Sequence, residues 1–180
     1  MEMMVMHMVK EGLFGEVVHC SGGYCHDLRS EVARGEENRH CRLRNYLSRN
    51  CENYPTHELG PIAQVLGINR GNRMLSLTSM ASKACGMHEW LEKHRPDSPL
   101  ARAAFNEGDI VTTMIKCAGG ETILLTHDCT LPRPYSRAGV IRGTKGMWME
   151  DGRSIYLEGV TPVEPGDWEH HPEPDQKYME

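Results

Sequence analysis

The stretch DIVTTMIKCAGGETILLTHDC, residues 109–129, decides the fold class of this chain. Its two runs, 109–117 and 121–129, are rich in valine, isoleucine, threonine and leucine, which is typical of β-strands. Gly119 and Gly120 stand between the runs and are a tight hairpin signal. The stretch therefore predicts two antiparallel strands.

The flanking segments predict more strands together with helices. We expect strands over 14–23, 73–82, 138–143, 147–150 and 154–158, and helices over 1–11, 57–67 and 86–94. Gly12 ends the first of these helices, Thr56 and Gly67 bound the second, and Ser98-Pro99 starts a further short helix. The arginine-rich segment 25–53 is predicted to be a long ordered loop. This order predicts an α+β fold, with a largely antiparallel, open-faced sheet covered by helices on one face.

Composition narrows the functional classes. The chain has 180 residues, 39% of them hydrophobic, which is enough for one domain with a core. Its net charge of −5 gives no electrostatic case for nucleic-acid or membrane binding. Its seven cysteines are odd in number and form no CxxC, so we expect free thiols. We place a domain at 1–160 and an acidic, proline-rich tail at 161–180.

Three clusters of residues could carry chemistry. In NCENYPTHELGP, residues 50–61, His57 lies at a predicted helix start with Tyr54 nearby, where an imidazole can transfer protons. In GGYCHDLR, residues 22–29, Tyr24 and Arg29 follow paired glycines that would let a ligand approach the backbone. In THDCTLPRPYSR, residues 126–137, two prolines stiffen a loop that carries Tyr135.

Each cluster also has a purely structural interpretation. His57 could cap or pack its helix, the second cluster could be a turn with a His26–Asp27 hydrogen bond, and the third could be a rigid surface turn. The histidines and aspartates of these clusters match no metal-site spacing, so we expect no metal. No GxGxxG lies between a strand and a helix, so we expect no dinucleotide phosphate cradle and assign no cofactor-binding residue to this chain.

Taken together, the segments GLFGEVVHCSGGYCHDLR, RLRNYLSRNCENYPTHELGPIAQVLGINRG and THDCTLPRPYSRAGVIRGTKGMW resemble one protein family. They are similar to the C-terminal domain of the Gfo/Idh/MocA oxidoreductase superfamily, and within it to glycoside hydrolase family 109. The resemblance runs from residue 1 to about 160. It implies a substrate-binding domain that follows a nucleotide-binding Rossmann domain, and we expect that domain to be absent from this chain. Glu58 departs from the family pattern, which has a small residue at this position.

The resemblance also implies a reaction and roles for individual residues. A bound NAD would oxidise the sugar, the C1 leaving group of an α-N-acetylgalactosaminide would be eliminated, water would add, and the hydride would return. His57 would be the catalytic acid–base group and Tyr24 its proton-transfer partner. The sugar-binding residues would be Arg42, Tyr54 and Tyr135.

Two other functions remain open from the sequence. The chain could belong to an NAD(P)-dependent sugar dehydrogenase, or it could be a non-enzymatic module for sugar binding or dimerisation. We expect a small glycoside as its partner and a homodimer through the open sheet face. We also expect the chain alone to bind NAD poorly and to turn over no substrate.

Overall fold

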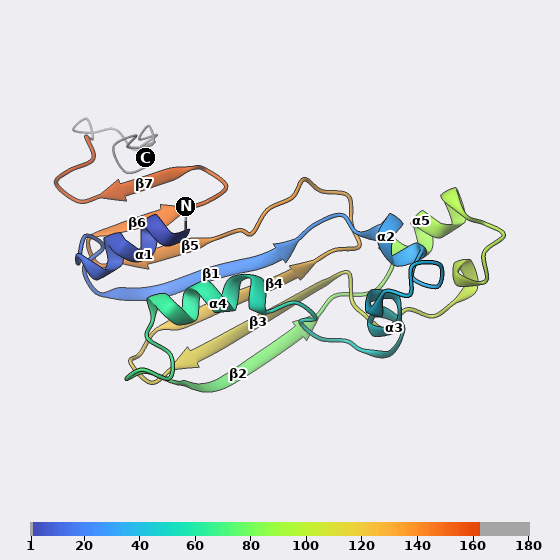
Figure 1. The fold of residues 1–180 in the computed structure, drawn as a ribbon, viewed down its shortest axis with the longest axis horizontal. Coiled ribbons are helices and arrows are strands. Elements are labelled where there is room, and N and C mark those ends of the chain that lie inside the picture. The colour runs from blue at the N-terminus through green and yellow to red at the C-terminus, as the bar shows by residue number, and fades with distance from the viewer. Residues whose placement is uncertain (1, 163–180) are drawn as a thin grey trace.

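A computed structural model describes residues 2–162 of the protein. Within that range, seven strands form one sheet in the order β2-β3-β4-β1-β5-β6-β7 (Figure 1). The strands are β1 (Val17–Cys25), β2 (Met74–Ala81), β3 (Ile110–Cys117), β4 (Thr122–Asp128), β5 (Val140–Gly143), β6 (Gly146–Met149) and β7 (Ser154–Leu157). All the predicted strands are confirmed, with ends that differ from the predicted ones by at most three residues.

The hairpin of β3 and β4 confirms the prediction from residues 109–129. The two strands are antiparallel from Ile110↔Asp128 to Lys116↔Thr122, and Gly120 takes a φ of +103° in the turn. Every neighbouring pair in the sheet is antiparallel except β1 with β4, which is parallel. Because parallel strands run in the same direction, β1 and β4 end at the same edge of the sheet.

A first core fills the space between the sheet and two helices that lie on the same face of it. These helices are α1 (Glu2–Lys10) and α4 (Thr56–Val65) (Figure 1). Side chains on β3 alternate between buried and exposed, because successive residues of a strand point to opposite faces. The buried members of the first core are Val5, Met8, Phe14, Cys20, Ile62, Leu66, Ile115, Cys117, Ile123, Leu125, Ile141, Trp148, Ile155 and Leu157. The opposite face bears exposed side chains such as Met80 and Met114.

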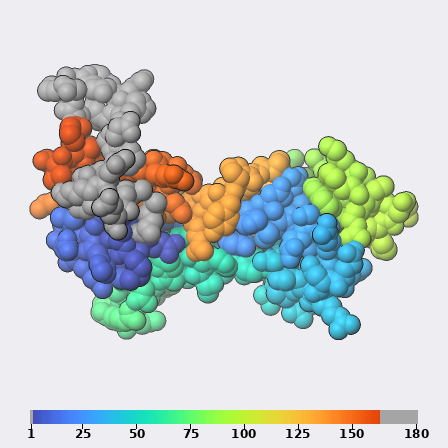
Figure 2. Space-filling view, turned by 45° about the horizontal axis from the view of Figure 1, so that its top comes forward, coloured from blue at the N-terminus to red at the C-terminus, as the bar shows by residue number. Residues whose placement is uncertain are grey.

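A second core lies beyond the common end of β1 and β4, where the short helices gather. They are α2 (Arg29–Ala33), α3 (Cys41–Ser48), α5 (Gly86–His94) and the 3₁₀ helix η1 (Pro99–Arg102). In Figure 2 these helices form a lobe at one end of the elongated molecule. Its buried residues are Tyr24, Leu28, Val32, Ala33, Leu43, Tyr46, Met87, Leu91, Leu100, Ala101 and Cys129.

The prediction of a long loop over 25–53 is wrong, because α2 and α3 both lie within it. Each helix supplies only two buried side chains, Val32 and Ala33 from α2 and Leu43 and Tyr46 from α3. That is too few for a visible helical period in the sequence. The two helices pack against each other, and α2 also packs against α5, so tertiary contacts stabilise elements that local pattern does not predict.

The other helix boundaries follow the sequence with one exception. Gly12 and Gly67 adopt φ values of +75° and +62° just beyond their helices, as expected of helix stops. The side chain of Ser98 accepts a hydrogen bond from the amide of Leu100 and caps η1. Thr56 was expected to cap α4 but is its first residue, and the chain enters that helix through Pro55.

The proposed tail at 161–180 lies almost wholly outside the described residues, so its character and the domain boundary at 160 stay predictions. Among residues 2–162, no helix combines the length and the apolar character needed to cross a membrane.

Candidate functional site

Four of the five predicted site residues meet at the common end of β1 and β4. Tyr24 comes from β1, His57 from the first turn of α4, Tyr54 from the segment before it, and Arg42 from α3. The ring of Tyr24 is centred 4.2 Å from that of His57 and 5.0 Å from that of Tyr54. The guanidinium carbon of Arg42 lies 5.5 Å from the centre of the Tyr54 ring. Residues far apart in the sequence therefore form one aromatic and basic cluster.

Several polar atoms of this cluster are buried without a hydrogen-bond partner among residues 2–162. They are Nε of Arg42, the hydroxyl of Tyr54 and Nδ1 of His57. A buried polar group without a partner costs free energy in a folded protein, and such groups are rare. A polar ligand that reached the cluster would supply these three atoms with hydrogen-bond partners.

The fifth predicted residue, Tyr135, lies at the rim of the cluster and is 54% exposed. Its hydroxyl accepts a hydrogen bond from Nε of Arg137, and Arg137 in turn donates to the carbonyl of His57 at 2.8 Å. The ring of His26 packs edge-on against Tyr135, with the centroids 5.3 Å apart. Arg137 therefore joins Tyr135 to the start of α4, and His26 is a neighbour to which the sequence assigned no role.

The charge state of the cluster follows from burial. Burial raises the pKa of the Tyr54 phenol, and the nearby Arg42 guanidinium partly offsets the effect. Tyr54 therefore keeps its proton at neutral pH and can donate a hydrogen bond. Arg42 also lies 3.5 Å from the Glu31 carboxylate, which holds its guanidinium toward α2.

Two other arginines of the predicted clusters have structural partners. Arg29 bonds the carboxylate of Asp27 through Nε and a terminal nitrogen, at 2.9 and 2.7 Å. Asp27 is therefore paired with Arg29, while Nδ1 of His26 lies 3.2 Å from the carbonyl of Asp27. Arg133 forms an ion pair with Asp128.

Glu58, the residue that follows His57, is buried beside the cluster. A Cβ atom placed on Gly22 would lie 2.6 Å from the Cβ of Glu58, so only glycine leaves room for this side chain. Burial raises the pKa of Glu58 to about 8, the charges of Glu2 and Glu150 add to the rise, and Arg137 opposes it. Nε of Arg137 lies 3.8 Å from Oε1 of Glu58.

A layer of buried polar residues lies behind the cluster, and the sequence did not reveal its arrangement. His127 is fully buried, with Nε2 at 2.8 Å from the hydroxyl of Tyr46. Glu107 is 2% exposed and accepts hydrogen bonds from the amide of Cys51 and the side chain of Asn53. His127 belongs to a predicted cluster, but no sequence signal marked the role of Glu107, because an isolated glutamate has no pattern.

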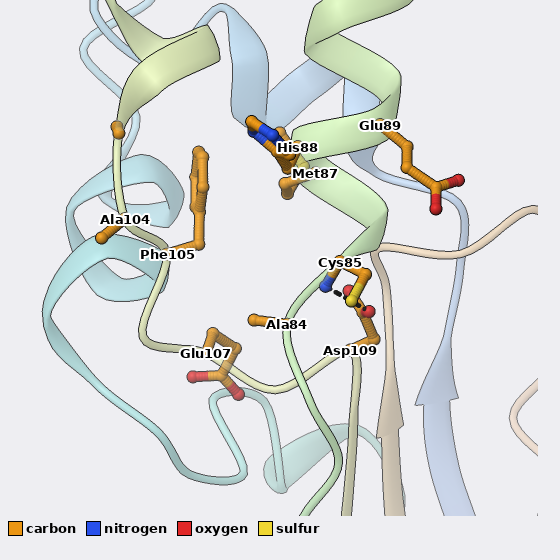
Figure 3. Close-up of a pocket in the computed structure, with 10 residues that line it drawn as sticks. Ala84, Cys85, Met87, His88, Glu89, Ala104, Phe105, Glu107 and Asp109 are labelled. Atoms are coloured by element: carbon orange, nitrogen blue, oxygen red, sulfur yellow. Dashed lines mark hydrogen bonds between the residues drawn. The ribbon is translucent and has the colours of Figure 1, made fainter.

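A cavity of about 380 Å³ lies nearby, at the start of α5. Figure 3 shows Asp109 beside Cys85 on one side of it and Phe105 on the other. The Asp109 carboxylate accepts hydrogen bonds from the amides of Cys85 and Gly86 and from the hydroxyl of Thr130. Asp109 thus joins the start of α5 to the ends of β3 and β4, which is a structural role.

The starts of α3 and α5 fit the phosphate end of a dinucleotide poorly. Asp109 occupies the amides at the start of α5, and His40 accepts the amide of Arg42 at the start of α3. These helix starts are therefore not free to bind a pyrophosphate. Within residues 2–162, no group of three or more histidine, cysteine or acidic side chains is placed to hold a metal ion.

Comparison with known proteins places the chain in a family. The model described as glycosyl hydrolase 109, C-terminal domain, matches residues 1–180. The chain is 44% identical to an alpha-N-acetylgalactosaminidase from Tannerella forsythia, over 98% of this chain and 41% of that protein. It is 41% identical to an alpha-N-acetylgalactosaminidase from Shewanella oneidensis, over 87% of this chain and 35% of that protein. The chain thus spans well under half the length of these relatives.

Solved structures agree on the fold. An inositol dehydrogenase homolog from Azotobacter vinelandii, complexed with NAD+, matches with a TM-score of 0.54 and 16% identity, over 95% of this chain and 42% of that one. A levoglucosan dehydrogenase in complex with NADH and levoglucosan matches with a TM-score of 0.58 and 17% identity, over 87% of this chain and 40% of that one. The fold is that of a Gfo/Idh/MocA C-terminal domain, as the sequence predicted.

Proposed function

Because the chain belongs to the glycosyl hydrolase 109 family, we propose that it is the sugar-binding part of an NAD-dependent α-N-acetylgalactosaminidase. The observation that carries the proposal is the cluster of Tyr24, Arg42, Tyr54 and His57, with its three buried polar atoms that lack partners among the described residues. A sugar ring offers hydroxyl and amide groups to such atoms and an apolar face to tyrosine rings.

In this proposal, His57 holds and returns the proton of the reacting sugar hydroxyl. Its Nδ1 is buried and has no partner in the described part of the chain, so a ligand that reached it would complete its hydrogen bonding. Tyr24 lies against the His57 ring and is the candidate partner for that proton. Arg42 and Tyr54 orient the sugar by hydrogen bonding, and Tyr135 closes the rim through Arg137.

NAD enters this proposal as a group held mainly by the nucleotide-binding part of a longer protein. When bound, it supplies hydride acceptance and return. Among the described residues, the starts of α3 and α5 would hold no pyrophosphate, because His40 and Asp109 already accept from their amides. The homodimer expected through the open sheet face also stays a prediction.

Two measurements test the proposal. The 180-residue chain should bind N-acetylgalactosamine, observed as saturation-transfer NMR signals from the sugar, and His57→Ala should weaken them. A chimera with the N-terminal part of the Tannerella forsythia relative should cleave a nitrophenyl α-N-acetylgalactosaminide in the presence of NAD. In the chimera, His57→Ala should reduce turnover by about 10²–10⁴-fold, the range of general acid–base catalysis.

The outcomes separate the three functions that the sequence left open. Cleavage without net NADH supports the glycosidase. Net NADH with free sugar and no cleavage would show a dehydrogenase and contradict the proposal. Sugar binding by the chain, together with a folded chimera that neither cleaves nor reduces NAD, would leave a binding module and also contradict it.

A further inference from the structure

His127 occupies a position directly behind the two site tyrosines. It pairs with Tyr24 in the parallel register of β1 and β4, and its side chain is fully buried. The centre of its ring is 5.7 Å from that of Tyr54 and 6.5 Å from that of Tyr24. His127 therefore lies close to the rings of both site tyrosines.

Both ring nitrogens of His127 face a polar group. Nε2 is 2.8 Å from the hydroxyl of Tyr46 on α3, and Nδ1 is 3.4 Å from Oε1 of Glu52. The same Oε1 accepts a hydrogen bond from the backbone amide of Tyr54 at 3.2 Å. One carboxylate oxygen thus links His127 to the backbone of a residue in the sugar site.

The surroundings of His127 favour its charged form. Burial alone lowers its pKa, but Cys129 and Glu52 outweigh burial and raise the pKa to about 10. A charged imidazole donates from both nitrogens, which matches one acceptor at Tyr46 and one at Glu52. The titratable groups that face the ring are Tyr24 of β1, Tyr46 of α3, Glu52 and Tyr54 of the loop before α4, Glu107 of the loop before β3, and Cys129 after β4.

We propose that Glu52 and His127 form a buried ion pair that positions Tyr54 for sugar binding. The inference deepens the proposed function and rests on it for the identity of the ligand. Glu52 fixes the backbone of Tyr54, and His127 fixes both Glu52 and the back of the Tyr54 ring. Both are positioning residues, because they act through Tyr54.

The two nitrogens of His127 are tested separately by substitution. His127→Asn keeps a donor near the position of Nδ1 and preserves the contact with Glu52, whereas His127→Gln keeps one near Nε2 and preserves only the contact with Tyr46. We expect His127→Gln and Glu52→Gln to weaken N-acetylgalactosamine binding by about tenfold or more, since a misplaced binding group is costly. His127→Asn should weaken binding less than His127→Gln does, because it keeps a donor to Glu52 although it loses the charge of the ion pair.

A matched control comes from an exposed histidine–glutamate pair. His88 and Glu92 lie 3.2 Å apart on α5, with side chains more than half exposed. His88→Gln should leave sugar affinity unchanged, because an exposed pair contributes little.

NMR of the chain with ¹⁵N-labelled histidine measures the protonation state of His127 in the absence of sugar. Both ring nitrogens of His127 should be protonated at pH 8, and Glu52→Gln should lower the pKa of His127 and shift the Tyr54 ring signals. A neutral His127 at pH 8 would overturn the proposal. So would a folded His127→Gln chain that binds sugar as the unsubstituted chain does.

The failure of the proposed function would look different. In that case the unsubstituted chain would bind no N-acetylgalactosamine, while the charge of His127 and the response of Tyr54 to Glu52→Gln would still be observed. If His127→Gln fails to fold, Glu52→Gln provides the affinity test, because it keeps the shape of the side chain but removes its charge and one of its two acceptor oxygens.

Discussion

The two cores of this chain share strands β1 and β4 but differ in chemistry. On β4, Ile123 and Leu125 belong to the first core, and His127, two residues further on, lies behind the candidate site. On β1, Cys20 belongs to the first core and Tyr24 to the second. The same strands therefore change from apolar to polar along their length. The first core stabilises the sheet. The ends of β1 and β4 near the second core instead carry buried polar groups, and a ligand would supply the hydrogen-bond partners that some of these groups lack.

The largest expected effect uses the two phenylalanines of the chain, one packed in each core. Phe14 is fully buried in the first core, whereas Phe105 packs partly exposed against the second. Phe14→Ala should lower the free energy of unfolding by about 3–5 kcal/mol, because it leaves a cavity in a closed core. Urea denaturation measures the loss.

Phe105→Ala is the matched variant and should cost about 1–2 kcal/mol, because less apolar surface is lost. If the two variants lost the same free energy of unfolding, the two cores would be packed alike and would not differ in the way described above.

The next effect concerns Glu58, which contacts β1 at Gly22, between the two cores. Its pKa is raised from an ordinary value near 4.5 to about 8, so the folded chain binds this proton more tightly than the unfolded chain. Its contribution to stability is complete below pH 4.5 and is lost as the pH rises toward 8. Glu58→Gln should remove this dependence and stabilise the chain by roughly 2–4 kcal/mol at pH 9 relative to the unsubstituted chain.

Urea denaturation at pH 5 and pH 9 measures the effect, and the exposed Glu11→Gln is the control. A second fall in stability should remain in the Glu58→Gln chain between pH 6.5 and 10, because His127 has its pKa raised over that range. A Glu58→Gln chain that loses as much stability on going from pH 5 to pH 9 as the unsubstituted one would show that Glu58 is ionised in the folded state.

The smallest expected effect on stability tests whether the Tyr54 hydroxyl binds a ligand or stabilises the fold. The hydroxyl of Tyr54 is buried without a partner among the described residues, so Tyr54→Phe should change the free energy of unfolding by less than about 0.5 kcal/mol, or raise it. Its affinity for N-acetylgalactosamine should fall about tenfold, as expected for a lost hydrogen bond. Thermal unfolding and NMR titration measure the two effects.

Tyr46→Phe provides the comparison, since the Tyr46 hydroxyl bonds the buried His127. It should destabilise the chain by about 1–3 kcal/mol. If Tyr54→Phe were the more destabilising of the two, the polar end would be a structural core and not a binding site.

The difference between the cores also explains what the sequence could predict. The valine, isoleucine, threonine and leucine residues of 109–129 and the glycines at 119–120 were enough to predict the hairpin, and Gly12 and Gly67 marked two helix ends. Helices α2 and α3 were missed, because their stability comes from contacts with each other and with α5. The parallel pairing of β1 with β4 carries no local signal.

The candidate site divides in the same way. Tyr24, Tyr54 and His57 were found because they lie in distinctive motifs, and the fold brings them together. The contact between Glu52 and His127 could not be predicted, because the two residues lie in different segments and only the folded structure brings them together. Resemblance identifies residues that would touch a ligand more readily than those that hold them.

The parallel pairing of β1 with β4 has a consequence for how the chain folds. The β3–β4 hairpin closes through a short turn, but the bond of His19 to Thr122 joins residues 103 positions apart. Closing so long a loop has a higher entropic cost, and non-local pairings of this kind slow folding. During synthesis, β1 is made before both of its neighbours in the sheet, β4 and β5, and stays unpaired until they follow. The strand that carries Tyr24 is therefore made before its two neighbours in the sheet, and its edges can aggregate until those strands cover them.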